Sequence, residues 1–514
     1  MAHVERLIDS RSGRSTERES GHSAIAKTSV LLPSDYYLMV PSPEASGRMH
    51  LEHSKRSKQS VQIAAALGST FAPFMVGALI VAAPTIGKEF TADVTLLSWL
   101  TAAFFLAAAA CLIPFGRAAD IRGAKRIFIL GLGTSALSTA IGLAAPDIYV
   151  LIAARALMGI GAGMIFGTTV ALVSLVFPAS ERPRAIGINV TAMFIGYASG
   201  LLVGGYLSAY FSWRLIFLIA LVLCLASMLL TWLRVRGECE LARVHDYDFT
   251  GMGSYALGIV LIFFGLARIS SLIGALSLVG GAAVLILFIM HERRYPVPLI
   301  HREITRSRGF RSAIATNIAF QAGSFAFPFL ISLHLQYVSK IDPLLSGLIL
   351  LLPQSLMILL GPASYRLADR FGRRKLVGAA CIMDAVAVAM VMNISAETPM
   401  LLIVTALGVF GVATGLFMPA VLAWSLGEVS RENFGVASAY TETTRLAGMT
   451  LSNAVVIIVF GVVLGAQQVN PAVIPQFLNG AQLSLAVLVA LSLAGAVISL
   501  GIATRFASRH KKNS

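Results

Sequence analysis

The chain is poor in charge and in cysteine, and each shortage excludes a class of protein. Asp, Glu, Lys and Arg make up 13% of its 514 residues, whereas 57% are hydrophobic, and so apolar a chain is not a soluble domain. Its four cysteines lie far apart without the spacing of metal ligands, so we expect packing residues and no metal. The sequence contains no G-x-x-x-x-G-K-S/T segment and no nucleophile elbow. ATP hydrolysis and enzyme catalysis are therefore unsupported, and no cofactor is expected.

Long hydrophobic runs are abundant instead. Fourteen of them approach the roughly 20 residues that a helix needs to cross a bilayer, which predicts an all-α polytopic membrane protein. They lie at about residues 61–84, 94–115, 127–145, 149–176, 185–208, 214–234, 250–267, 271–290, 312–335, 344–364, 376–395, 400–425, 435–465 and 481–504.

The basic residues predict the orientation of these spans. The net charge of +15 is scattered among short loops, which indicates a preference for one leaflet and not a nucleic-acid site. With the N-terminus in the cytosol, the outward loops contain only four basic residues, Lys88, Arg214, Arg268 and Lys340. We therefore expect a multi-pass protein of the cell or inner membrane with both termini in the cytosol. Residues 1–59 are polar and predict a disordered cytosolic tail.

A charged, glycine-containing loop occurs twice between hydrophobic runs. GRAADIRGAKR from Gly116 to Arg126 is followed much later by RLADRFGRRK from Arg366, which indicates two related halves. The matching residues are Asp120 and Asp369, Gly123 and Gly372, and Lys125–Arg126 and Arg374–Lys375, with Arg373 completing the second basic cluster. A carboxylate at a helix end, a glycine three residues later and cations facing an anionic leaflet predict a hinge between two spans. An ordinary positively charged cytoplasmic turn is the alternative.

These loops resemble the signature G-x-x-x-D-x-x-G-R/K-R/K between helices 2 and 3 of the major facilitator superfamily. Gly116, Asp120, Gly123 and Lys125 match it, with Ala124 at the first basic position. In the second copy Gly372, Arg373 and Arg374 match, while Tyr365 replaces the first glycine. The resemblance implies a secondary transporter in which these loops act in conformational switching.

Fourteen spans resemble the fourteen-helix drug:proton antiporter branch of that superfamily. The fold implied has a tail at 1–59, a six-helix bundle at 60–236, a linker with two extra transmembrane helices at 237–295, a second six-helix bundle at 296–508 and a tail at 509–514. The activity implied is proton-coupled efflux of lipophilic or amphiphilic small molecules by a monomer whose partners are substrate, protons and the lipid bilayer. A proton-independent facilitator and a non-transporting membrane receptor remain alternatives.

Two intramembrane motifs carry the resemblance further. Arg155 lies within an apolar run, where a guanidinium is costly unless it faces a cavity or a partner. The family's R-x-x-Q-G motif ties this Arg to proton transfer, although Met158 replaces its Gln. An Arg that reaches the membrane interface from a helix end is the alternative. Four glycines, Gly196, Gly200, Gly204 and Gly205, match the antiporter motif G-x-x-x-G-P-x-x-G-G, with Leu201 in place of its Pro. We expect all four on one helix face, where small residues let a neighbouring helix approach closely.

Acidic residues are scarce within the spans. The branch usually has an Asp in its first span, where this chain has Met75. Two other acids, Asp384 and Glu442, lie well inside hydrophobic runs, and such a carboxylate is a functional candidate because its ionised form is costly there. Glu442 has Arg445 three residues later on the same face, so a structural ion pair is equally open there. Asp384 is thus the better candidate for a proton carrier, and solvation in a water-filled crevice without a role is its alternative.

Several polar and aromatic residues are candidates for a substrate cavity between the halves at mid-membrane. They are Phe104, Asn189, Tyr197, Asn317, Gln321, Phe325 and Gln354. Helix packing is the alternative for each of them.

Overall fold

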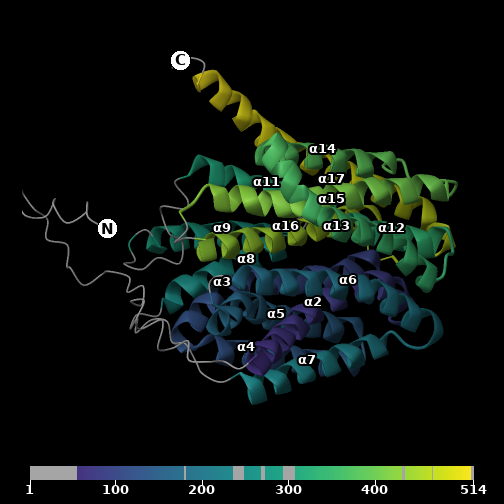
Figure 1. The fold of residues 1–514 in the computed structure, drawn as a ribbon. Helices are drawn as coiled ribbons and strands as arrows, with labels where there is room; N and C mark the ends of the chain where they lie inside the picture. Colours follow the sequence, from purple (N-terminus) through teal and green to yellow (C-terminus); the bar gives the residue numbers. More distant parts are fainter. Residues whose placement is uncertain are drawn as a thin grey trace, which may run out of the picture. The chain divides into compact units, whose positions relative to one another are not determined.

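Each of the fourteen predicted runs forms a helix in the computed structural model, which describes residues 55–178, 181–235, 248–267, 272–292, 294, 307–430, 434–465 and 467–510 (Figure 1). The first seven are α2 (Lys55–Glu89), α3 (Val94–Arg122), α4 (Ala124–Leu143), α5 (Ile148–Val176), α6 (Arg182–Tyr210), α7 (Arg214–Arg234) and α8 (Phe249–Ala267). After α9 (Leu272–Glu292), the ninth run forms α11 (Arg308–Ser324), α12 (Phe327–Leu333) and the π-helix η1 (His334–Val338). The last five are α13 (Pro343–Phe371), α14 (Arg373–Met390), α15 (Met400–Gly427), α16 (Phe434–Val463) and α17 (Ile474–His510), which the 3₁₀ turn η3 (Pro471–Val473) precedes.

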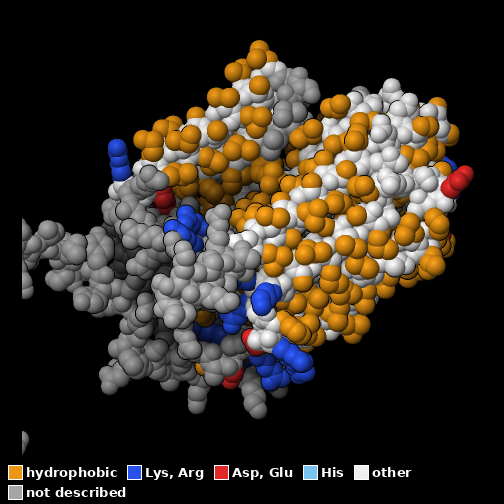
Figure 2. All heavy atoms as spheres, turned by 90° about the horizontal axis from the view of Figure 1, so that it is seen from above, with side chains coloured by type: hydrophobic (Ala, Val, Ile, Leu, Met, Phe, Trp, Pro, Cys, Tyr) orange, Lys and Arg blue, Asp and Glu red, His pale blue; other side chains and the backbone are white. Residues whose placement is uncertain are grey.

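Most of these helices suit a bilayer by length and hydropathy. Among the described residues, 12 are long and apolar enough to cross one. The other two are α8, whose apolar stretch Thr250–Gly265 is shorter, and α14, which begins with a basic cluster and contains Asp384. Large aliphatic side chains are exposed on the outer helices, for example Leu272, Leu276 and Val279 of α9. The hydrophobic face in Figure 2 has its Lys and Arg gathered towards one end, as expected for an integral, multi-pass membrane protein.

Within the first half of the chain, α2 packs against α6 and α7, α3 against α5, and α4 against α5 and α7. Within the second half, α15 packs between α13 and α14, while α17 packs against α11, α14 and α16. The two halves meet where α3 contacts α16, where α6 contacts α13 and where α2 contacts α12. The extra helices α8 and α9 pack on each other, and α8 also contacts α3 and α16.

Acidic residues cap helices at the end of the molecule opposite its basic loops. Asp93 Oδ1 accepts a hydrogen bond from Leu96 N at 2.7 Å at the start of α3, and Asp342 does the same for Leu345 N at 3.0 Å at the start of α13. Asp147 caps α5 in the same way. Each carboxylate satisfies an N–H group that the helix leaves unpaired, so these acids have a structural role.

The two copies of the charged loop have the same backbone conformation. Gly123 (φ 95°, ψ 131°) ends α3 and begins α4, and Gly372 (φ 88°, ψ 130°) ends α13 and begins α14. A side chain is strained at such positive φ, so the turn requires glycine at both places. The repeat recognised in the sequence is therefore also a repeat of local structure.

Candidate functional site

A mostly apolar cavity of about 140 Å³ lies where the two halves meet. The first half contributes aromatic side chains from α3, α5 and α6, namely Phe104, Phe105, Phe166, Phe194 and Tyr197. The second half contributes Phe320, Phe325 and Phe410, and four methionines complete the wall, Met193, Met357, Met418 and Met449. Phe105 and Phe325 meet edge to face with ring centroids 4.8 Å apart, so an aromatic contact joins the halves beside the cavity.

Few polar groups interrupt this wall. They are Gln321, Ser324, Gln354, Thr414 and Arg445, all from the second half, together with the hydroxyl of Tyr197. Gln321 Nε2 donates to the thioether of Met418 at 3.2 Å, and Arg445 Nη1 donates to that of Met449 at 3.5 Å. No described Asp or Glu lines the cavity. Arg445 is consequently the charged group that a bound molecule would meet.

Five of the seven residues suggested for a cavity line this one: Phe104, Tyr197, Gln321, Phe325 and Gln354. The two asparagines do not. Asn189 Oδ1 accepts from Gln62 Nε2 at 2.9 Å, which ties α6 to α2, and Asn317 Nδ2 donates to Thr441 O at 2.9 Å, which ties α11 to α16. Both are buried, and the hydrogen bond to a neighbouring helix offsets part of the cost of burying each amide.

A proline creates a hydrogen-bonded contact between the halves that we did not expect. Pro84 in α2 has no N–H, so the carbonyl of Ile80 one turn earlier has no helical donor. Ser332 Oγ of α12 donates to that carbonyl at 2.9 Å. Two side chains of η1 add to it: Gln336 Nε2 donates to Val81 O at 3.0 Å and Tyr337 Oη to Pro84 O at 3.3 Å. We call Ile80, Val81, Pro84, Ser332, Gln336 and Tyr337 the α2–α12 seal. A proline late in an apolar run is the sequence signal for such a free carbonyl.

Three of the four motif glycines face α2. A Cβ added at Gly196, Gly200 or Gly204 would collide with α2 at Thr70, Phe74 or Ala78 respectively. The expectation that all four share one face is wrong, because Gly205 packs against Pro343 of α13. Adjacent helical residues point about 100° apart, so a residue next to the stripe meets a different helix. The close approach of α6 to α2 holds the cavity wall in place, since Pro73 next to Phe74 lines the cavity.

The second charged loop is bonded to α15. Arg373 Nη1 donates to Ala423 O at 2.8 Å, and Arg374 pairs with Glu428 at 2.7 Å while its guanidinium lies over the ring of Trp424. Glu428 was not anticipated, since nothing in its local sequence relates it to the loop. In the first loop, Gly116 packs near Gly167 of α5, whereas the side chain of Asp120 lies outside the described residues.

Arg155 is fully buried in α5 without a carboxylate partner among the described residues. Its Nε donates to Leu100 O at 2.9 Å, its Nη1 to Met158 Sδ at 2.9 Å, and its Nη2 has no partner. The guanidinium carbon lies 4.5 Å from the centre of the Phe104 ring. Phe104 also lines the cavity. An aromatic ring and a carbonyl thus stabilise the charge behind the cavity wall.

Comparisons with known proteins identify this architecture. A model described as Major Facilitator Superfamily matches residues 65–453. The chain belongs to that superfamily of transporters. It is similar to a riboflavin transporter of Clostridioides difficile (23% identity, 73% of this chain and 82% of the relative) and to the multidrug efflux pump LfrA of Mycolicibacterium smegmatis (27%, 73% and 75%). A probable actinorhodin transporter of Streptomyces coelicolor is 27% identical over 88% of this chain and 80% of its own length.

Solved structures of the superfamily share the fold. A peptide transporter crystallised with sulfate superposes with a TM-score of 0.64 at 14% identity, over 88% of this transporter and 94% of that chain. A bacterial homologue of the human lysosomal transporter Spinster, crystallised in an inward-facing and unoccupied conformation, gives 0.63 at 16% identity, over 87% and 97%.

The first span of this transporter contributes no acid to the cavity. Met75, at the position of the branch's Asp, is fully buried in the core, and Ala72, Pro73 and Val76 are the residues of α2 that line the cavity. If protons are coupled, the carboxylate that carries them has to come from elsewhere in the chain.

Asp384 is a fully buried carboxylate on α14, next to the cavity wall. Ser492 Oγ of α17 donates to its Oδ2 at 2.6 Å, while its Oδ1 has no hydrogen-bond partner among the described residues. Ser324 of α11 faces the same carboxyl group and also lines the cavity. Gly323 lets α17 approach, because a Cβ there would collide with Ser492. One serine thus separates Asp384 from the cavity.

Glu442 and Arg445 form an ion pair within α16. Arg445 Nε donates to Glu442 Oε2 at 2.8 Å, and Arg445 Nη2 donates to Oε1, so the carboxylate occupies one edge of the guanidinium. Arg445 lines the cavity and Glu442 does not. The pair offsets part of an otherwise costly charge and leaves Nη1 of Arg445 on the cavity side.

The described cysteines are packing residues. Cys224 and Cys381 are buried and Cys111 is half-buried, all unpaired, while Cys239 lies outside the described residues. No group of three or more potential metal-binding side chains was found among the described residues.

Proposed function

We propose that this transporter exports lipophilic or amphiphilic small molecules in exchange for protons, and that Asp384 carries the proton. The observation that supports the proposal most is a buried carboxyl group with no described cation beside it, one serine away from an aromatic cavity. A carrier must both take up and release its proton. A permanent Arg partner would hold it ionised, which favours Asp384 over Glu442.

The surroundings of Asp384 suggest how protonation would act on the helices. An ionised carboxylate is costly inside a membrane unless donors or water reach it, and here Ser492 donates to only one of its oxygens. Deprotonation would therefore favour a rearrangement of α11, α14 and α17 that brings further donors or water to Oδ1. Such a rearrangement would move Ser324 and hence the cavity wall, which couples the proton to the substrate.

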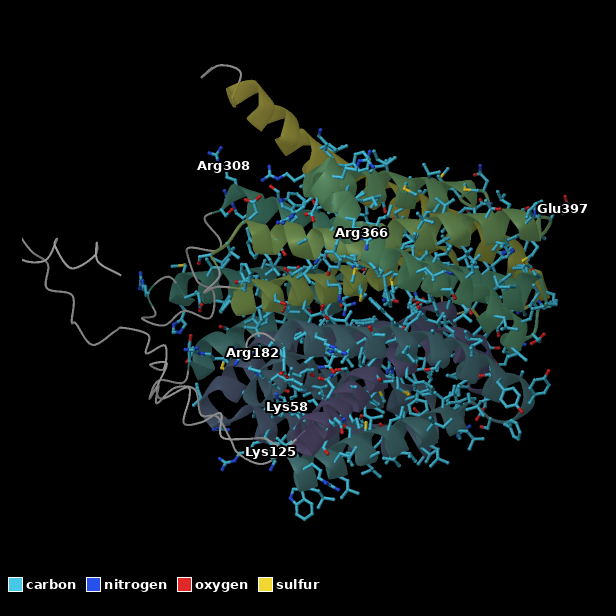
Figure 3. All side chains as sticks on the ribbon, in the orientation of Figure 1. Lys58, Lys125, Arg182, Arg308, Arg366 and Glu397 are labelled. Atoms are coloured by element: carbon cyan, nitrogen blue, oxygen red, sulfur yellow. The ribbon has the colours of Figure 1, made fainter. Side chains whose placement is uncertain are left out.

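The seal and the charged loops suggest which side of the membrane is closed off in this structure. Basic residues such as Lys58, Lys125, Arg182 and Arg308 lie at one end of the molecule and Glu397 at the other (Figure 3). By the positive-inside preference we assign the basic end to the cytosol. The α2–α12 seal lies towards the opposite end and would then close the external side. We assign the loops at Gly123 and Gly372 to the cytosolic hinge of the two bundles, 60–236 and 296–508.

Export is the part of the proposal supported by relatives whose names state efflux or resistance, such as LfrA. The composition of the cavity supports a lipophilic substrate independently, because aromatic and methionine side chains bind apolar molecules of varied shape.

The experiment compares two neutral isosteres, Asp384→Asn and Glu442→Gln, in vesicles loaded with a fluorescent amphiphile. Transport is measured with and without an imposed pH gradient. Asp384→Asn should lose the response to the gradient while exchange down a substrate gradient continues, and Glu442→Gln should keep the response. If both variants respond as the unaltered protein does, Asp384 is not the carrier. If the unaltered protein transports the amphiphile equally well without a pH gradient, it is a facilitator. If it transports nothing under any gradient, the receptor alternative is favoured.

A further inference from the structure

The charge of the cavity wall bears on the kind of molecule that it binds. Arg445 is the charged side chain among the described lining residues, and no described carboxylate lines the cavity. Behind Phe104 lies a second guanidinium, that of Arg155, without a carboxylate partner among the described residues. A cationic substrate would thus meet like charge at close range in a low-dielectric site, where the repulsion is strong.

Two hydrogen-bond donors on the wall have sulfur as their acceptor in the described part of the chain. Arg445 Nη1 donates to the sulfur of Met449 at 3.5 Å and Gln321 Nε2 to the sulfur of Met418 at 3.2 Å. A thioether is a weak acceptor, so both N–H groups would gain from a substrate oxygen. Gln321 lies on α11 and Arg445 on α16, and these helices touch beside the two residues. A Cβ added at Gly448, one turn from Arg445, would lie 2.6 Å from Gln321 Cβ.

The guanidinium is arranged to offer one side to a ligand. Glu442 occupies the edge formed by Nε and Nη2, outside the cavity, and Nη1 remains on the cavity side. The ion pair keeps Arg445 in place when the cavity is empty, while its charge is not fully neutralised towards the cavity. An anionic group of the substrate would compete with Glu442 for the same guanidinium.

We propose that the cavity selects flat aromatic molecules bearing an anionic oxygen group, and that Arg445 Nη1 and Gln321 Nε2 bind that group. This deepens the proposed function and rests on the cavity being the substrate site. The aromatic and methionine wall takes the ring system: an apolar cavity of about 150 Å³ holds a benzene molecule, and this one is of about that size and partly open. Neutral analogues bind more weakly and cationic ones most weakly.

The test uses three probes of one shape: benzoate, benzamide and benzamidine, which carry a carboxylate, a carboxamide and a carboxamidine with charges of −1, 0 and +1. Equilibrium binding of each radiolabelled compound is measured on the purified transporter in lipid nanodiscs at a single pH. Because no gradient is present, a failure of proton coupling would leave this measurement unaffected. The expected order of affinity is carboxylate, carboxamide, carboxamidine.

Variants identify the residue that binds the anionic group. Arg445→Gln should weaken carboxylate binding about tenfold or more, since a charge-assisted hydrogen bond is lost, and change carboxamide binding less than about threefold. Retained carboxamide binding in the same preparation shows that the variant is folded. Glu442→Gln, which removes the competing carboxylate, should tighten carboxylate binding, and Arg445→Lys should retain part of it. The proposal is overturned if the carboxamidine binds as tightly as the carboxylate, if Arg445→Gln weakens all three probes equally, or if none of them binds.

Discussion

Gly200 illustrates what a single residue does in this membrane protein. Between helices in lipid, no hydrophobic driving force is available, so contact depends on how closely two backbones approach. At Gly200 the space that a side chain would need is already taken by the carbonyl of Phe74 in α2, and Gly77 of α2 meets Tyr197 of α6 in the same way. These mutual contacts position Pro73 and Tyr197, both of which line the cavity.

We expect Gly200→Ala to lower the thermal stability of the purified protein, because the new methyl group forces α6 and α2 apart. Overpacking of this kind costs about 1–3 kcal/mol. The matched control is Gly187→Ala in the same helix, where nothing lies within 4 Å of the added Cβ. Thermal unfolding of both variants in one detergent provides the comparison, and equal unfolding temperatures would show that the close approach is not needed.

At the scale of an element, α2 is both a span and one side of a hydrogen-bonded contact between the two halves. Its proline frees the carbonyl of Ile80, and a serine from the other half of the chain occupies that carbonyl. A helix without proline would satisfy the carbonyl internally and leave the serine without an acceptor. The α2–α12 seal therefore depends on an irregularity in one helix that is complemented by a second helix and by the π-helical turn η1.

Removal of one seal hydrogen bond should shift the protein towards the state in which the seal is open. A hydrogen bond contributes about 0.5–1.5 kcal/mol, so Ser332→Ala should raise the open-to-closed ratio about two- to tenfold. The change is measured with spin labels at Lys88→Cys and Ser339→Cys, two exposed positions that follow the seal residues of α2 and η1. In pulsed electron resonance, opening increases the population with a long distance between the two labels.

The control for this measurement is Ser355→Ala in α13, whose hydroxyl donates only to Leu351 of its own helix. Its distance distribution should match that of the labelled parent. A Ser332→Ala distribution that also matches the parent would mean that the bond does not hold the gate.

For the whole molecule, the separation of charge between its two ends predicts its orientation in the membrane. Basic residues such as Lys58, Lys125 and Arg308 lie at one end and Glu397 lies at the other (Figure 3). Exposed aliphatic side chains cover the outer helices. Anionic lipid and the insertion machinery favour basic loops in the cytosol. The described ends thus agree with a single way of threading the chain through the bilayer.

A thiol-labelling experiment tests this orientation. Cys239 follows the sixth predicted span in a basic stretch of the sequence that the charge count assigns to the cytosol, so in intact cells it should escape an impermeant maleimide and become labelled only after lysis, with the other three cysteines replaced by serine. Glu397→Cys, exposed at the opposite end, should be labelled in intact cells once Cys239 is also replaced. The reverse pattern would invert the topology.

The sequence alone determined the number of helices, the all-α fold class and the two glycine turns. It could do so because each of these features depends on residues that are close together in the chain. A bilayer requires every spanning segment to be apolar and to form its backbone hydrogen bonds within itself. Each span is therefore a continuous apolar stretch that can be recognised in the sequence. The turns at Gly123 and Gly372 are equally local, because a positive φ is a property of one residue and its neighbours. Phe104 and Gln321 could be suggested for the cavity because polar and aromatic residues are conspicuous within apolar runs.

Only the tertiary structure decided which helix each of these residues meets. Asn189 and Asn317 resemble Gln321 in sequence but bond to neighbouring helices, and Gly205 departs from its stripe because α13 happens to lie there. Contacts such as Ser332 with Ile80, or Ser492 with Asp384, join residues more than 100 positions apart. Helical periodicity defines a face of a helix but not the neighbour of that face, and packing of small residues against backbone, which selects the neighbour, leaves little trace in a single sequence.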